Sequence, residues 1–253
     1  MLAVQESLKE IVKFFLRRSN IWLIYSQKNK VSGCNLFKDL KSLLKSESPI
    51  CFDVGANEGQ TIKLLQEVFR SPRIYAFEPS SEVFTKLRSR RYRSDVFLYN
   101  FALGRQNSQE EFINYEDSRL SSFFPLSTDE ESQFGHLKIK AKESVEIKTI
   151  DWFLTRYQIN EIDLLKIDTQ GYDLQVLQGA SESFRRGSIK NVYVELNFLK
   201  LYENQADAQQ ITRFLTEHNF YLVDYYEKSR SEDVLVWCNG LFTRRQSATA
   251  EHK

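Results

Sequence analysis

The chain has 253 residues, of which 42% are hydrophobic, 27% are charged and four are prolines. This length and composition suit one large globular domain and exclude a disordered or collagen-like chain. The formal charge of +1 gives no whole-molecule field that would attract nucleic acid, so we expect no nucleic-acid partner.

The cysteines are few and lie far apart, at Cys34, Cys51 and Cys238. Their spacing is not that of a zinc site or of a secreted disulfide framework. We therefore expect a reducing, cytoplasmic setting.

Residues 1–47 are expected to form a helical extension, with helices at 4–18 and 35–46. Lysines and arginines interrupt the most apolar stretch, 11–24, so we predict neither a transmembrane span nor a signal peptide. The first helix could pack its apolar face on the main domain. It could also lie on the inner face of an anionic membrane as a peripheral contact.

Residues 48–241, the expected main domain, alternate between strand-like and helix-like patterns. Nearly continuous apolar runs predict buried parallel strands at 50–54, 73–77, 96–101, 162–167 and 189–196. Helical patterns run through 64–68 and cover 80–87, 151–157, 173–184 and 206–218. Segment 104–142 has short β-like pieces but no long helical period, and it is predicted to be an insertion over the sheet.

Two further strands, 221–226 and 234–238, flank a charged turn at 227–233 and should pair antiparallel. Five parallel strands with helical crossovers, followed by this pair, predict an α/β fold with a doubly wound, seven-stranded, mostly parallel sheet. Residues 242–253 are predicted to be a polar tail.

Glycine and acidic residues follow the predicted strands at their carboxyl ends, where an open α/β sheet binds its ligand. After the first strand, Gly55 and Gly59 permit a tight turn, and Asn57 tolerates the left-handed conformation. Glu78 ends the second strand, where a carboxylate can accept hydrogen bonds from both hydroxyls of a ribose. Together these residues predict a site for a nucleoside-bearing cofactor.

A dinucleotide-binding oxidoreductase would share the acidic residue but would carry G-x-G-x-x-G in the turn. The turn at 55–59 lacks this spacing, and Glu58 within it would repel a pyrophosphate. Glu58 and Asp53 favour instead the ammonium group at the methionine end of S-adenosylmethionine. An NAD-dependent oxidoreductase is therefore the less favoured enzyme class.

Four motifs in chain order resemble the signatures of the FkbM family of methyltransferases. They are Asp-Val-Gly-Ala-Asn-x-Gly at 53–59, Ala-Phe-Glu-Pro at 76–79, Ala-Leu-Gly at 102–104 and Lys-Ile-Asp-Thr-Gln-Gly-Tyr-Asp at 166–173. The likeness covers about residues 48–226. It implies a Rossmann-like class I methyltransferase fold, S-adenosylmethionine as cofactor, and O-methylation of a sugar, a glycan or a polyketide-type natural product.

With this cofactor, Gly55 to Gly59 would hold the methionine end, Glu78 the ribose, and Asn100 and Ala102 the adenine side. The expected cofactor-binding residues are Asp53, Gly55, Ala56, Asn57, Gly59, Glu78, Pro79, Asn100, Ala102 and Asp168.

Transfer of a methyl group to a hydroxyl is an in-line displacement that needs alignment and removal of the hydroxyl's proton. The resemblance places Asp168 at the strand end that faces the transferred methyl group. Glu195, His136 and Asn197 are further candidates for the catalytic base. Asp168, Glu195 and Asn197 also offer oxygen ligands suited to Mg²⁺, which could acidify a bound hydroxyl.

Structural roles would also explain these residues. Asp168 could cap the following turn, Glu195 could pair with Lys166, and His136 could be a solvated loop residue. Gln170 stands where many family members carry a glutamate, so a non-catalytic binding or scaffold protein remains the second class of function.

On the acceptor side, aromatic residues that follow strand ends could line a pocket for a small molecule or glycan. They are Tyr172, Phe198 and Tyr202. Segment 121–124 falls where the family has a serine-containing segment near its active site.

Overall fold

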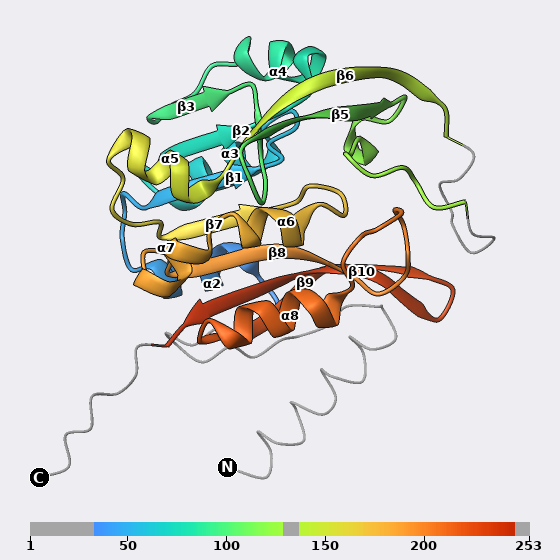
Figure 1. Cartoon of the computed structure of the whole chain (residues 1–253). Coiled ribbons are helices and arrows are strands. Elements are labelled where there is room, and N and C mark those ends of the chain that lie inside the picture. The colour runs from blue at the N-terminus through green and yellow to red at the C-terminus, as the bar shows by residue number, and fades with distance from the viewer. Residues whose placement is uncertain (1–32, 129–136, 246–253) are drawn as a thin grey trace, which may run out of the picture.

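The computed structural model of the chain describes residues 33–128 and 137–245. A seven-stranded sheet in the order β3-β2-β1-β7-β8-β10-β9 forms its centre (Figure 1). Its strands are β1 (Ile50–Val54), β2 (Arg73–Phe77), β3 (Val96–Tyr99), β7 (Leu164–Ile167), β8 (Asn191–Asn197), β9 (Phe220–Ser231) and β10 (Val234–Arg244). The neighbours from β3 to β8 pair parallel, and β10 pairs antiparallel with both β8 and β9. This confirms the predicted doubly wound, mostly parallel sheet.

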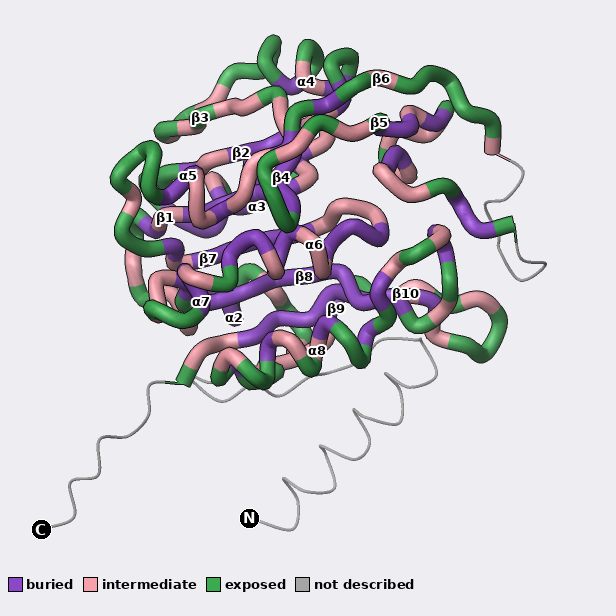
Figure 2. The backbone as a smooth tube through the Cα atoms, in the orientation of Figure 1, coloured by how far each residue is buried: buried purple, intermediate pink, exposed green. Residues whose placement is uncertain are grey.

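Helices cover both faces of the sheet (Figure 1). One face, here called the α2/α3 face, packs against α2 (Leu36–Leu44), α3 (Gln60–Val68) and α4 (Ser81–Arg88). The other packs against α5 (Ile150–Tyr157), α6 (Asp173–Gln178), α7 (Ser181–Arg186) and α8 (Ala208–Glu217). The central strands β7 and β8 are buried along their whole length, as their apolar sequences predict (Figure 2).

The predicted insertion and the residues next to it form a second, three-stranded sheet in the order β4-β6-β5. Its strands are β4 (Ala102–Leu103), β5 (Ser108–Tyr115) and β6 (Ile139–Lys148), and a 3-10 turn, η1 (Ser118–Leu120), follows β5. The described part of the insertion is therefore held by strand pairing rather than by α-helices. His136 lies outside the described residues, and so does the predicted helix 4–18 with its possible membrane contact.

The single helix predicted at 173–184 is two helices, α6 and α7. Gly179 packs so closely on the insertion that a Cβ there would lie 1.9 Å from the carbonyl oxygen of Gly104. Asp151 then starts α7 by accepting hydrogen bonds from the backbone N–H groups of Glu182 and Ser183, at 3.0 and 2.9 Å. The break comes from contacts with residues distant in sequence.

The charged turn predicted at 227–233 is mostly strand, because β9 and β10 continue to a two-residue turn at Glu232 and Asp233. β10 also extends to Arg244, beyond the expected domain boundary at 241, and Phe242 is fully buried. At the other end, Leu40 of α2 is buried in the core. Within the described ranges, no helix is long and apolar enough to cross a membrane.

Candidate active site

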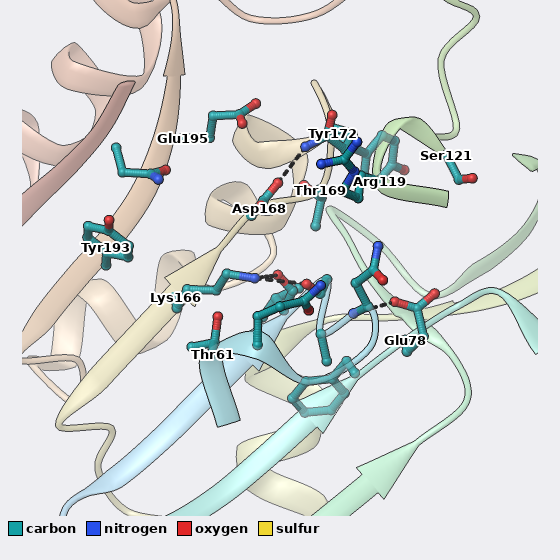
Figure 3. Close-up of a pocket in the computed structure, with 18 of the residues that line it drawn as sticks. Thr61, Glu78, Arg119, Ser121, Lys166, Asp168, Thr169, Tyr172, Tyr193 and Glu195 are labelled. Carbon is teal, nitrogen blue, oxygen red and sulfur yellow. Dashed lines mark hydrogen bonds between the residues drawn. The ribbon is translucent and has the colours of Figure 1, made fainter. Parts of the chain in front are cut away.

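A cavity of about 520 Å³ lies at the carboxyl ends of β1, β2 and β7. Its walls come from the loops that follow these strands, from η1, and from α2, α3, β4, β5, β8, β9 and β10. An open α/β sheet binds ligands at this edge, and the volume is typical of a small-molecule site. Figure 3 shows Glu78 and Asp168, which directly follow β2 and β7, and Glu195, which lies near the end of β8.

The loop after β1 needs glycine at its first position. Gly55 has a φ of 77°, and the N–H groups of Gly55 and Ala56 donate to the carbonyl oxygen of Phe77 at 3.1 and 3.0 Å. A Cβ at position 55 would lie 1.9 Å from the carbonyl oxygen of Asp168. Only glycine therefore lets the loops after β1 and β7 approach this closely.

Glu78 lies in the cavity wall with 6% of its surface exposed. Its Oε2 accepts a hydrogen bond from the N–H of Asn57 at 2.8 Å, and its Oε1 accepts one from the N–H of Ser80 at 2.9 Å. Burial raises the pKa of Glu78 to about 7, although these two donors act in the opposite direction. Each oxygen keeps a further lone pair, so the carboxylate can accept hydrogen bonds from two ligand hydroxyls.

Three of the predicted cofactor-binding residues do not line the cavity. Those that do are Gly55, Ala56, Asn57, Glu78, Pro79, Ala102 and Asp168. Asn100 instead donates its amide to the carbonyl oxygens of Glu78 and Pro79, at 3.0 and 3.1 Å, and holds this strand end in place. Gly59 caps α3, and Asp53 is fully buried.

Asp53 and Lys166 form a buried ion pair. They are neighbours in the register of β1 and β7, and Lys166 Nζ lies 2.9 Å from Asp53 Oδ1. Nζ also donates to the carbonyl oxygen of Gly55 at 2.8 Å. Burial alone would lower the pKa of Lys166, but Asp53 and Asp168 outweigh burial, so the pKa is raised. Strand register thus gives Lys166 a different partner from Glu195, the partner considered from the sequence.

Replacing Lys166 with methionine should destabilise the folded protein by about 3–5 kcal/mol, because Asp53 would be left buried without its counter-ion. Urea unfolding measures the loss. The double variant Asp53→Asn/Lys166→Met removes both charges and should recover most of the stability. Equal instability of the single and double variants would show that the ion pair is not the cause.

Two acidic residues share the turn after β7 and have different surroundings. Asp168 lines the cavity, and its Oδ1 accepts a hydrogen bond from Gln170 Nε2 at 2.7 Å (Figure 3). Asp173 is buried and accepts hydrogen bonds from the N–H groups of Thr169 and Gly171, at 3.0 and 3.1 Å. Asp173 therefore caps the turn, and Asp168 is available to a ligand.

Glu195 completes this acidic cluster from β8, in the cavity wall with 6% of its surface exposed. Burial raises its pKa well above the usual range, and Asp168 and Asp173 raise it further. Burial also raises the pKa of Asp173 to about 6. The cluster therefore favours a proton on Glu195, which limits the repulsion around Asp168.

Gln170 connects Asp168 to the insertion. Its backbone is left-handed, with a φ of 55°. Its Oε1 accepts a hydrogen bond from the fully buried Tyr202 hydroxyl at 2.7 Å, and its carbonyl oxygen accepts one from Ser122 Oγ at 2.7 Å. An amide can donate to Asp168 and accept from Tyr202 at once, whereas an ionised glutamate could not donate.

The predicted acceptor-side residues are only partly in the cavity. Tyr172, Ser121 and Phe123 line it. Phe198 is outside the cavity lining and 44% exposed, and Tyr202 is buried behind Gln170.

The predicted Mg²⁺ ligands do not form a shared site. Asp168 and Glu195 line the cavity, but Asn197 is buried outside it and donates its amide to Glu195 Oε1 at 3.0 Å. In the described part of the chain, no group of three or more His, Cys, Asp or Glu side chains is placed to hold a metal. These residues therefore do not fit the expected metal.

Sequence reasoning missed several polar residues of the cavity wall. They are Thr61, Asp117, Arg119, Lys166, Tyr193, Glu227, Ser229 and Asn239. Lys166 had a usable signal, because a lysine inside an apolar strand needs a buried partner. The others have none, since they reach the cavity only through the way that α3, η1, β8 and the β9–β10 hairpin pack in the folded chain.

The model of one protein family, described as the methyltransferase FkbM domain, matches residues 53–222. The chain belongs to the FkbM methyltransferase family. The match includes Glu78, Asp168 and Glu195, and it confirms the resemblance drawn from the motifs. As a member of the FkbM family the protein is an S-adenosylmethionine-dependent methyltransferase, which overturns the oxidoreductase alternative.

Two relatives of this FkbM protein are named as methyltransferases, one for a 2-O position and one for a hexuronic acid. The chain is 23% identical over 212 residues to the 2-O-methyltransferase NoeI of Sinorhizobium fredii, and the matched region is 81% of this chain and 86% of the relative. It is 23% identical over 192 residues to the hexuronic acid methyltransferase AglP of Haloferax volcanii, which covers 75% of this chain and 70% of the relative.

A solved structure, the methyltransferase FkbM of Methylobacillus flagellatus KT, has the same fold. It matches 78% of this chain with a TM-score of 0.52 and 13% identity, and this chain spans 44% of that one.

The cavity residues fit S-adenosylmethionine. Glu78 offers two acceptor oxygens at a strand end, and Asp168 adds negative charge for a cationic ligand.

Proposed function

We propose that the protein transfers a methyl group from S-adenosylmethionine to a hydroxyl of a sugar or glycan and forms a methyl ether. The observation that carries the proposal is Asp168, a carboxylate in the cavity wall held by the amide of Gln170. The names of both relatives favour this acceptor class over a polyketide, since one is a 2-O-methyltransferase and the other a hexuronic acid methyltransferase.

In this proposal, the strand-end residues bind the cofactor along its length. Glu78 accepts hydrogen bonds from the ribose hydroxyls, and Pro79 and Ala102 contact the adenine side. The backbone from Gly55 to Asn57 contacts the methionine end. Bound S-adenosylmethionine supplies a methyl group on a positively charged sulfur, and the carboxylates of the cavity favour that charge.

Asp168 accepts the proton of the acceptor hydroxyl while the new C–O bond forms. Gln170 donates to Oδ1, which holds the carboxyl group in position and leaves Oδ2 for the acceptor. Burial raises the pKa of Glu195, so this side chain is protonated and places no second negative charge beside Asp168. The products are the methyl ether, S-adenosylhomocysteine and a proton.

Affinity for S-adenosylmethionine should fall as the pH is lowered through 7. The pKa of Glu78 is raised to about 7 in the free protein, so below this pH the carboxyl is protonated and must lose its proton to accept both hydroxyls. The dissociation constant at pH 6 should be roughly tenfold higher than on the plateau above about pH 8. Calorimetric titration checks this, and Glu78→Gln should show weak, pH-independent binding. An unchanged pH dependence in that variant would assign the proton to another group.

Incubation with S-adenosylmethionine carrying a tritiated methyl group tests the function directly. Label should appear on members of a saccharide panel and not on matched phenolic compounds. Tight cofactor binding with no transfer to any saccharide would favour the non-catalytic scaffold alternative.

A further inference from the structure

The cavity extends beyond the residues needed for the cofactor, along the α2/α3 face to the β9–β10 hairpin. Polar residues of β8, β9 and β10 line this end together with Trp237. We call this set the hairpin subsite, and its members are Tyr193, Glu227, Ser229, Trp237 and Asn239. None of them is used in the proposed transfer of the methyl group.

Glu227 reaches the cavity because the hairpin is irregular at this point. Trp237 pairs with Ser229 and Asn239 pairs with Tyr226, so two residues of β9 lie opposite one residue of β10. Such a bulge redirects a side chain and is common beside active sites. Glu227 also has a φ of 49°, a conformation that residues other than glycine rarely adopt.

Two buried donors hold the Glu227 carboxylate. The hydroxyl of Tyr193 and the amide of Asn239 both donate to its Oε2, at 3.0 and 2.6 Å. Tyr193 is 8% exposed and Asn239 is 9% exposed, whereas Glu227 itself is exposed. Within the described residues, Oε1 of Glu227 accepts no hydrogen bond, so it can accept one from a ligand.

The hairpin subsite lies at a defined position relative to Asp168. Asp168 directly follows β7, Glu195 lies beside it on β8, and Asn239 pairs with Glu195 on β10. Neighbouring strands are about 4.8 Å apart, so the backbone of Asn239 is two strand spacings, about 10 Å, from the backbone of Asp168. A group bound there is therefore separate from the hydroxyl that is methylated.

We propose that the hairpin subsite binds a second sugar residue, so that the acceptor is a disaccharide or a longer glycan. This inference rests on the proposed function and names its substrate more closely. Glu227 Oε1 and the Ser229 hydroxyl hydrogen-bond the ring hydroxyls, and Trp237 offers an indole surface for the apolar face of the ring. Tyr193 and Asn239 fix the carboxylate in position.

The test compares Glu227→Gln with Glu232→Gln. Glu232 is a matched control, because it lies in the turn of the same hairpin with a φ of 50° but does not line the cavity. Each protein is saturated with S-adenosylhomocysteine and titrated with cellobiose, cellobiouronic acid, glucose and glucuronic acid in a calorimeter. The affinity for S-adenosylmethionine is measured separately.

We expect a disaccharide to bind more tightly than its monosaccharide. Glu227→Gln should weaken disaccharide binding by about tenfold and change monosaccharide binding and S-adenosylmethionine affinity little, with Glu232→Gln like the unmodified protein. Equal binding of mono- and disaccharides, no effect of Glu227→Gln, or no saccharide binding would overturn the subsite. Weaker S-adenosylmethionine binding in Glu227→Gln would also overturn it, since the residue would then hold the cofactor. Disaccharide binding that depends on Glu227, without methyl transfer, would reject the proposed function and keep the subsite.

Discussion

Replacing Asp168 with asparagine should lower kcat by about 10² to 10⁴-fold, because the acceptor hydroxyl loses the group that removes its proton. Asparagine keeps the size of the side chain and still has an oxygen that can accept from Gln170. The dissociation constant for S-adenosylmethionine should change by much less than kcat. Rates at saturating substrates, with calorimetric titration of the cofactor, separate the two effects.

Gln170 allows a second test of the role of Asp168, because its amide donates to that carboxylate. Gln170→Met removes the donor to Asp168 and should lower kcat by roughly tenfold or more, the usual effect of losing a hydrogen bond to a charged group. In the Asp168→Asn background the same change should have almost no further effect on kcat, because Gln170 acts through Asp168. Independent, multiplying effects of the two changes would contradict the assigned roles.

Replacing Glu78 with alanine should weaken S-adenosylmethionine binding by about 1.5–3 kcal/mol for each ribose hydrogen bond lost, or at least tenfold. The rate at saturating cofactor should fall far less than in Asp168→Asn, because Glu78 is remote from the reacting hydroxyl in the proposed arrangement. Calorimetric titration measures the affinity.

Glu58→Ala is the matched control for Glu78→Ala. Glu58 lies in the neighbouring loop, but it forms an ion pair with Arg90 at 2.8 Å and does not line the cavity, contrary to its expected role toward the cofactor. Its removal should leave cofactor affinity within about twofold, as for other exposed ion pairs. Equal losses in the two variants would reject the ribose site at Glu78.

The sequence predicted the parts of the structure that depend on local pattern. The apolar runs that become β1, β2 and β7 are mostly buried, and their carboxyl ends bring Gly55, Glu78 and Asp168 to one cavity. These positions follow from the geometry of a parallel sheet, in which successive strand ends share one edge.

What the sequence could not predict depends on contacts between distant residues. Lys166 pairs with Asp53 because of the register between β1 and β7. Glu227 enters the cavity because of a bulge within a segment expected to be a turn. The break between α6 and α7 depends on Gly179 meeting Gly104 in the insertion. In each case the contacting partner is set by the folded arrangement and cannot be identified from the local sequence.

The most direct test of the proposed activity is the chemical stability of the transferred label. Saccharides, including uronic acids, are incubated with the protein and tritiated S-adenosylmethionine, and the labelled products are then treated with mild alkali. A methyl ether formed on a hydroxyl survives this treatment, whereas a methyl ester formed on a carboxylate is hydrolysed. We predict alkali-stable label that depends on Asp168. Label that is lost in alkali, or no label on any saccharide despite bound cofactor, would contradict O-methylation of a sugar hydroxyl.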